Sequence, residues 1–172
     1  AAAHLGHDGV VRQLIAAGAP LDHVNNLHWT AVIESIVLGD GGPRHQQTLQ
    51  ALIQAGANLQ LTDRQGNTPL HHAARSTDPG VAALLLDAQA RIDVANDNGQ
   101  TPLAMACAAG NWRLAKFLLE RGASVAPANA LAPLLAAATA DDDDPAGVQL
   151  LLRHRAQVAD AVDGDGRTAL HL

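Results

Sequence analysis

A four-residue pattern recurs along this chain at a fixed interval, and this recurrence constrains the fold more than any other feature. The sequence TPLH at residues 68–71 returns 33 residues later as TPLA at 101–104, and near the end as TALH at 168–171. Self-similarity with a period of this length is typical of repeat proteins, in which each unit buries its apolar face on the next. We therefore expect function to depend on a surface rather than on a pocket.

Each repeat has the pattern of two short helices. Thr68 followed by Pro69 predicts the start of a first helix, because threonine caps a helix and proline suits its first turn. Asp78 and Pro79 predict the start of a second helix in the same way. Apolar residues follow each start with helical spacing: Leu70, Ala73 and Ala74, then Val81, Leu84 and Leu85.

Glycines and turn sequences separate these helix pairs. Gly56 and Gly122 follow the second helices, where a chain usually adopts the left-handed conformation that glycine tolerates. Gln89 stands at the corresponding position and is predicted to be left-handed as well. The sequences DRQG at 63–66 and NDNG at 96–99 predict tight hairpins between repeats. The order within a repeat is therefore hairpin, helix, helix.

The chain resembles ankyrin-repeat proteins over essentially its whole length. The resemblance rests on GNTPLHHAA at 66–74 and GHDGVVRQL at 6–14, which match the repeat pattern at many positions in phase. It implies an all-α fold, an ankyrin-repeat solenoid of stacked helix-turn-helix units with short β-hairpin loops. The expected array is 1–172, divided into a partial repeat 1–24, repeats 25–62, 63–95, 96–126 and 127–162, and a partial repeat 163–172.

Two segments depart from the regular pattern. Residues 127–131 lack the Asp and Gly of the hairpin, and Leu135 replaces the histidine of TPLH, so an irregular hairpin is expected there. Residues 39–45 lengthen one repeat by five residues, and together with 29–34 they resemble an elongated repeat of bacterial ankyrin proteins. No Gly-Lys-Ser/Thr sequence follows these glycines, which argues against a nucleotide loop. Both ends fall inside a repeat, and we expect a piece of a longer array.

Composition argues against several classes of partner. The formal charge of −6, with Lys116 as the one lysine, disfavours nucleic acid as a partner. No apolar stretch is long enough to insert into a membrane. Cys107 is the one cysteine, aligns with Ala74 one repeat earlier, and is interpreted as a small buried residue. We expect a soluble protein, for which the cytoplasm is favoured although the compartment stays undetermined.

The nine histidines and the aspartate run suggest metal binding, but a structural role fits them better. The resemblance implies that His71 and His171 bond to the neighbouring threonine and backbone. The run Asp141–Asp144 is interpreted as a solvated loop that precedes a helix, because it lacks the alternating ligands of a calcium loop. Spacing also places no Ser, His and Asp together for catalysis. We expect no metal, no cofactor and no enzymatic activity.

The resemblance further implies that hairpins and first helices line a concave face whose variable residues bind partners. One variable column precedes each threonine, and the other follows the framework histidine. The candidate binding residues are Trp29, Asn67, Gln100 and Arg167 in the first column, and Glu34, His72 and Met105 in the second. Trp29 has the largest weight because Trp often dominates interface energy, although it could instead pack under the 39–45 loop.

The leading hypothesis is a non-catalytic scaffold that binds a partner protein, of unknown identity, on this concave face. The alternative is a regulatory or targeting segment of a larger enzyme whose catalytic domain lies outside this chain. Self-assembly through uncapped ends is a third hypothesis. Four residues 33 apart in the second helices are expected to lie on the outer face and to matter little for binding: Gln54, Asp87, Glu120 and Arg153.

Overall fold

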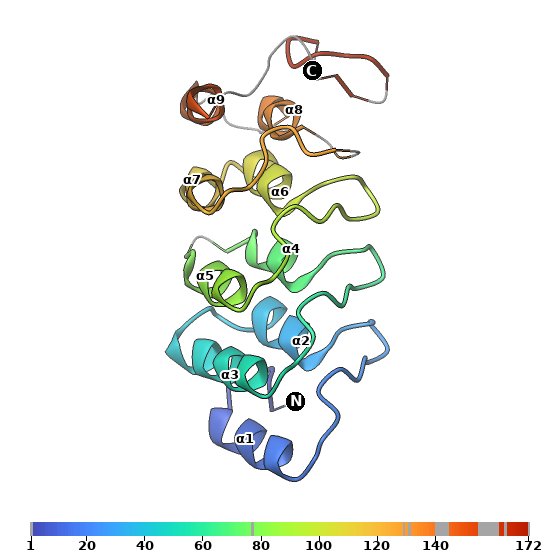
Figure 1. Cartoon of the computed structure of the whole chain (residues 1–172), viewed down its shortest axis with the longest axis vertical. Helices are drawn as coiled ribbons and strands as arrows, with labels where there is room; N and C mark the ends of the chain where they lie inside the picture. The colour runs from blue at the N-terminus through green and yellow to red at the C-terminus, as the bar shows by residue number, and fades with distance from the viewer. Residues whose placement is uncertain are drawn as a thin grey trace. The chain divides into compact units, whose positions relative to one another are not determined.

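The computed structural model (Figure 1) describes residues 2–76, 78–128, 130, 132–139, 145–154, 162–163 and 165–171, and its regular secondary structure there is helical. Short helices alternate with hairpin-like loops, and the one isolated β-bridge in these ranges joins Val162 and Thr168. The expected all-α repeat fold is confirmed. The chain divides into two compact units, an N-terminal unit Ala1–Arg91 and a C-terminal unit Ile92–Leu172.

The N-terminal unit contains two helix pairs and one helix before them. Its helices are α1 (Asp8–Ala16), α2 (Ala31–Val37), α3 (Pro43–Gln54), α4 (Pro69–Ala73) and α5 (Gly80–Asp87). The first helices α2 and α4 pack on each other, while α3 lies between α1 and α5. Helices therefore pack within a repeat, as α2 does on α3 and α4 on α5, and on the corresponding helix of the next repeat, as expected for stacked repeats.

The C-terminal unit repeats this arrangement. Its helices are α6 (Pro102–Ala108), α7 (Trp112–Glu120), α8 (Pro133–Ala138) and α9 (Pro145–Arg153). The helix α6 packs on α7 and α8, and α9 packs on α8 and α7. The run Asp141–Asp144, together with Asn129 and Leu131 of the expected irregular hairpin, lies outside the described residues.

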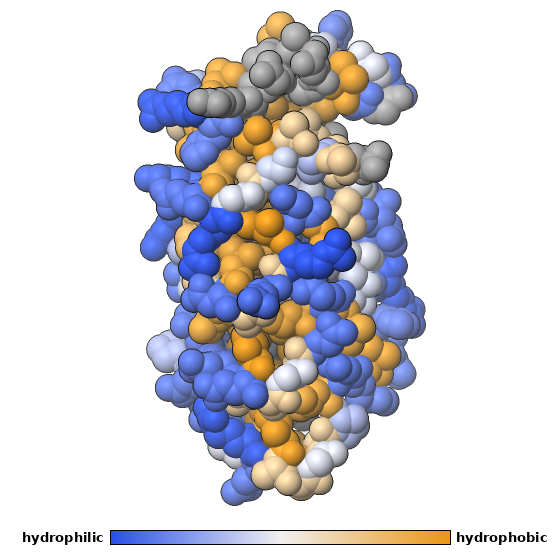
Figure 2. Space-filling model, in the orientation of Figure 1, coloured by the Kyte–Doolittle hydropathy of each residue, from blue (hydrophilic) through white to orange (hydrophobic). Residues whose placement is uncertain are grey.

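Leucine and other aliphatic residues form the core of each unit. Ile33, Leu70 and Leu85 are at most 1% exposed in the N-terminal unit, and Leu103 and Leu118 are fully buried in the C-terminal unit. Figure 2 shows that polar side chains cover much of the visible face of each unit, with apolar side chains between them. Small residues let the backbones approach closely, which explains how a chain almost without aromatic residues builds these cores.

The framework residues behave as the pattern predicts. The Thr30 and Thr101 side chains accept the N–H three residues further along and so cap α2 and α6. Cys107 is fully buried, and burial raises the pKa of its thiol to about 12, so the reactive thiolate is strongly disfavoured.

The residue two positions after α1, α3, α5 and α7 is left-handed. Gly18, Gly56 and Gly122 have φ values of 80°, 88° and 90°, and Gln89 has a φ of 63°. The predicted left-handed backbone at Gln89 is confirmed. Because glutamine carries a Cβ, it adopts this conformation at a cost that glycine avoids.

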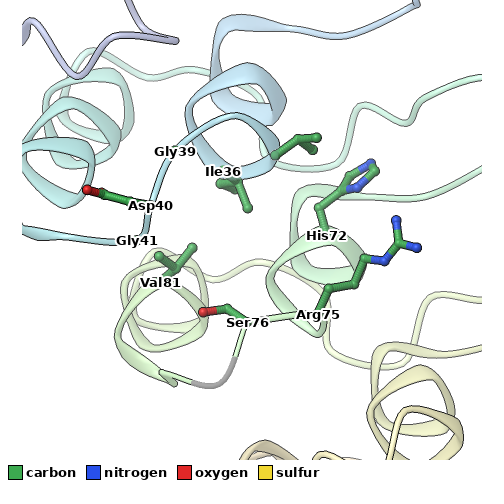
Figure 3. A pocket seen from close by; sticks show the side chains of 9 residues that line it. Ile36, Gly39, Asp40, Gly41, His72, Arg75, Ser76 and Val81 are labelled. Atoms are coloured by element: carbon green, nitrogen blue, oxygen red, sulfur yellow. The ribbon is translucent and has the colours of Figure 1, made fainter.

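The five-residue insertion changes a helix as well as a loop. Residues 39–42 form the loop, and α3 begins at Pro43 and runs for 12 residues, compared with 8 in α5 and 9 in α7. A cavity of about 260 Å³ lies beside this loop, between α2, α4 and α5 of the N-terminal unit (Figure 3). The inserted loop therefore forms part of the wall of this cavity.

Candidate functional site

The hairpins before α2, α4 and α6, and the hairpin that begins at Asp163, are each held by the side chain of their first residue. In every case the Oδ1 atom accepts the backbone N–H groups two and four residues further along, at distances of 2.8–3.1 Å. The residues that accept these bonds are Asn25, Asp63, Asn96 and Asp163. Bonds of this kind fix the conformation of a turn locally, so these loops do not depend on a β-ladder.

The fourth residue of each hairpin is left-handed. Gly66, Gly99 and Gly166 take this position with φ values of 70–75°, and His28 takes it with a φ of 64°. Sequence reasoning missed the hairpin at His28 because it carries no glycine. The signal that could have found it is Asn25, five residues before Thr30, as Asp63 is before Thr68.

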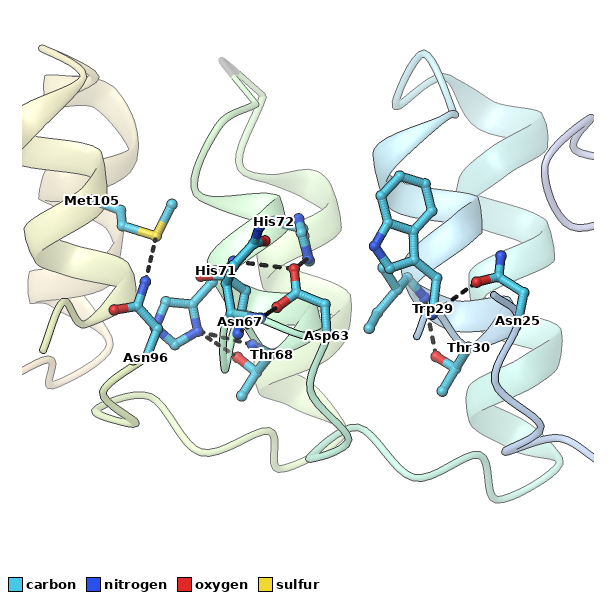
Figure 4. Close-up of polar contacts among 12 residues, drawn as sticks. Asn25, Trp29, Thr30, Asp63, Asn67, Thr68, His71, His72, Asn96 and Met105 are labelled. Carbon is cyan, nitrogen blue, oxygen red and sulfur yellow. Dashed lines mark hydrogen bonds and ion pairs between the residues drawn. The ribbon is translucent and has the colours of Figure 1, made fainter. Parts of the chain in front are cut away.

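The same hairpin residues also contact the first helix nine positions further along. Asn25 Nδ2 donates to Glu34 Oε1 at 2.7 Å. Asp63 Oδ2 lies 3.0 Å from His72 Nε2 (Figure 4). In the C-terminal unit, Asn96 Nδ2 approaches Met105 Sδ at 3.9 Å. The three candidate residues that follow the framework position, Glu34, His72 and Met105, are thus each positioned by a hairpin.

The contact between Asp63 and His72 is the most buried of the three. Burial by itself raises the pKa of Asp63, but hydrogen bonds from Asn67 and the N–H of Gln65 outweigh it and hold this pKa below 3.8. Burial lowers the pKa of His72 below 6.5, and the attraction of Asp63 only partly opposes this. A carboxylate facing a neutral imidazole is therefore the state at neutral pH.

Trp29 lies beside His72 in the N-terminal unit. The two rings meet edge to face, with centroids 6.4 Å apart and an interplanar angle of 67°. Trp29, Glu34, Asn67 and His72 are all partly exposed, whereas the adjoining Thr30, Thr68 and His71 are buried. The structure therefore gathers four of the seven candidate residues on the hairpins and first helices of one unit.

The remaining candidates belong to the C-terminal unit. Gln100 is partly exposed and its N–H donates to Asn96, whereas Met105 reaches the amide of the same residue. Arg167 is exposed, and its guanidinium pairs with Asp163 at 2.8 Å and with Asp165 at 3.3 Å. Arg167 thus supports the last hairpin in addition to being available on the surface.

The framework histidines make the bonds that the resemblance implied. His71 Nδ1 accepts the N–H of Thr68 at 3.1 Å and lies 2.8 Å from its hydroxyl, and His71 is fully buried. His171 contacts Thr168 in the same way, at 3.2 and 2.9 Å. His71 closes the first turn of α4, and His171 makes the same contacts in the turn at residues 168–171, a structural task that leaves little freedom for another ligand.

Neither a cluster of metal ligands nor a membrane-spanning helix is found among the described residues. Within these ranges no three His, Cys, Asp or Glu side chains are grouped so that they could hold a metal ion. No helix there is both long and apolar enough to cross a membrane.

Comparisons with known proteins agree with the geometry of these repeats. A family model described as ankyrin repeats in three copies matches residues 1–96 and 42–129. The chain belongs to the ankyrin-repeat family. Domains of this family generally act as protein–protein interaction modules. Membership therefore supports a general scaffold role for the chain.

Two individual relatives define how far the similarity extends. YahD of Escherichia coli (strain K12), named as an ankyrin repeat protein, is 38% identical over 84 residues, which cover 48% of this chain and 42% of that protein. The matched region thus spans less than half of the relative's length. The crystal structure of the ankyrin repeat domain of Bcl-3, a member of the IkappaB protein family, matches 99% of this chain and 76% of that chain. Its TM-score is 0.82, at 29% identity.

Proposed function

We propose that this chain is a non-catalytic scaffold that binds a partner protein through its hairpins and first helices. The residues proposed to make the contact are Trp29, Glu34, Asn67, His72, Gln100, Met105 and Arg167. Supporting this proposal, residues of differing chemistry alternate there with buried framework residues of fixed chemistry. A scaffold that displays changeable side chains on an unchanging fold has this pattern.

The observation that carries the proposal is that the hairpins before α2 and α4 lie against the helix that follows them. Asn25 donates a hydrogen bond to Glu34 at 2.7 Å, and the carboxylate of Asp63 lies 3.0 Å from the ring of His72. Side chains held in place before binding lose less conformational entropy when a partner arrives. Trp29 beside His72 adds a large ring of the kind that often dominates interface energy.

The test compares capture of partner proteins by two matched sets of variants. The inner set replaces Trp29, His72 and Met105 together by Ala. The outer set replaces four exposed residues of the second helices by Ala: Gln54, Asp87, Glu120 and Arg153. Proteins retained by each immobilised variant are quantified by mass spectrometry, and far-UV circular dichroism checks that both remain helical.

The inner set should reduce the amount of each specifically captured protein by about tenfold or more, because hot-spot residues commonly contribute more than 1 kcal/mol each. The outer set should change it by less than about twofold. Loss of capture by the outer set, with capture by the inner set intact, would show that the binding face has been assigned to the wrong side.

A further inference from the structure

Several contacts restrict the conformation of the loop inserted at residues 39–42. A Cβ on Gly39 would overlap the carbonyl oxygen of Ser35, and Gly41 is left-handed with a φ of 70°. Gln46 Nε2 donates to the Gly41 carbonyl at 2.8 Å, which ties the loop to α3. These contacts restrict the conformations that the loop can adopt.

Asp40 holds the same loop through its carboxylate. Its Oδ1 accepts the N–H of Gly42 at 2.8 Å and lies 2.8 Å from Nδ1 of His45. The opposite nitrogen of His45 contacts the carbonyl of His4 at 3.0 Å. These bonds lower the pKa of Asp40, the Gly42 bond most and the His45 bond next. Asp40 is therefore ionised at neutral pH, and its carboxylate is bonded to Gly42 and His45.

The fixed loop forms one wall of the cavity of about 260 Å³ seen in Figure 3. Ile36, Val37 and Val81 supply apolar surface, and His72 and Arg75 of the α4 region form the opposite wall. His72 also belongs to the proposed binding surface, so the cavity adjoins that surface. An apolar cavity with a few polar groups at its edge suits an inserted side chain.

Arg75 gives this cavity its charge preference. Its side chain is exposed, and within the described part of the chain no carboxylate lies within ion-pair distance of its guanidinium. Asp40, the acidic residue of the lining, is already bonded within its loop. A guest that carries a carboxylate would therefore meet a guanidinium able to bind it through two parallel hydrogen bonds.

We propose that this cavity receives an apolar side chain of the partner protein, flanked by an Asp or Glu that pairs with Arg75. This inference rests on the proposed function, because it takes the guest to be a segment of a bound protein. It goes further by naming the chemistry of that segment and the residues that select it.

The probe is a phage-displayed library of random peptides of about twelve residues, selected on the whole protein. Enriched peptides are synthesised, and their Kd values are measured by fluorescence anisotropy. The variant is Arg75→Glu, and the matched control is Arg113→Glu, the same charge change at an exposed position of α7. Thermal unfolding of both variants verifies that they are folded.

Enriched peptides should share an apolar residue within a few positions of Asp or Glu. Arg75→Glu should weaken their binding by about tenfold, and Arg113→Glu by less than about twofold. Replacing the acidic residue of a peptide by Lys should restore binding to the Arg75→Glu variant. Raising the salt concentration should weaken binding to the wild type, because salt screens exposed charges.

The inference is overturned if no peptide is enriched, if enriched peptides lack the acidic residue, or if both arginine variants behave alike. Peptides whose binding depends on Trp29 but not on Arg75 would be consistent with the proposed function but would show that the cavity is not where the partner side chain binds. Failure of the inner and outer comparison on captured proteins would instead contradict the proposed function itself.

Discussion

Gln89 occupies a backbone position that favours glycine, so its replacement should stabilise the protein. Its φ of 63° matches Gly18, Gly56 and Gly122 at the same place after their helices. The side chain of Gln89 is exposed, so its removal opens no hole in the core. The change Gln89→Gly therefore isolates the cost of the left-handed backbone.

The magnitude follows from two opposing terms. A residue with a Cβ loses about 1–2 kcal/mol in the left-handed conformation. Glycine itself lowers the free energy of unfolding by about 0.5–1 kcal/mol relative to a residue with a side chain, because it has more conformational freedom in the unfolded chain. The difference predicts that Gln89→Gly raises the free energy of unfolding by about 0.5–1 kcal/mol. The reverse change, Gly122→Gln, should lower it by a similar amount, since a Cβ there meets nothing within 4 Å.

The assay is urea unfolding followed by circular dichroism, with the free energy of unfolding taken by linear extrapolation. Gln50→Gly is the matched control, because Gln50 is exposed in the interior of α3, where the backbone is right-handed. The same chemical change should there destabilise the protein by about 1 kcal/mol. A fall in stability for Gln89→Gly, or equal effects at Gln89 and Gln50, would refute the reasoning.

Three further changes test the packing and the electrostatics. Gly147→Ala should destabilise the C-terminal unit by about 1–3 kcal/mol in urea unfolding, because the new Cβ would overlap the indole ring of Trp112; an unchanged midpoint would contradict this packing. Gly39→Ala should cost a similar amount, since its Cβ would overlap the Ser35 carbonyl, and wild-type stability would show that the loop is not fixed. Burial lowers the pKa of His72 in the folded protein, so the unfolded chain binds a proton at a higher pH than the folded chain does. The contribution of the neutral His72 to stability is therefore complete above about pH 6.5, and it is lost as the pH falls from there through the folded pKa. As the pH falls, the free energy of unfolding should decrease less for His72→Gln than for wild type, by at most about 1.4 kcal/mol per pH unit. Identical dependence of this free energy on pH in the two proteins would refute the prediction.

The fold could be predicted from sequence because its causes are local and repeat. Thr30 and Thr101 cap helices in a way that residue type and spacing reveal, and the period of 33 residues fixes which positions correspond. Alignment alone also predicted the left-handed Gln89, although glutamine gives no sign of it. Correspondence between repeats carried that information.

Contacts between a hairpin and its helix could not be predicted in the same way. Asn25 with Glu34, and Asp63 with His72, differ in chemistry from one repeat to the next. The spacing of nine residues becomes meaningful only after the turn geometry brings the hairpin beside the helix. Sequence reasoning therefore named Glu34 and His72 as surface residues but missed what holds them.

The insertion shows a second limit of reasoning from periodicity. Its length of five residues followed from alignment, but its distribution between a loop and a longer α3 did not. The cavity beside Arg75 depends on where Gly39 and Asp40 turn the chain, which no repeat elsewhere in the sequence duplicates. Irregular segments have no copy from which to infer their shape.

The central claim, that partners bind the hairpins and first helices, is tested most directly by photo-crosslinking. A benzophenone amino acid replaces Gln65, which is exposed in the hairpin before α4, in one variant and Gln54, which is exposed on α3, in the other. Each variant is irradiated with a partner isolated by affinity capture, and the cross-linked yield is measured. The account predicts abundant cross-links from position 65 and few from position 54. Abundant cross-links from position 54 with none from position 65 would contradict it.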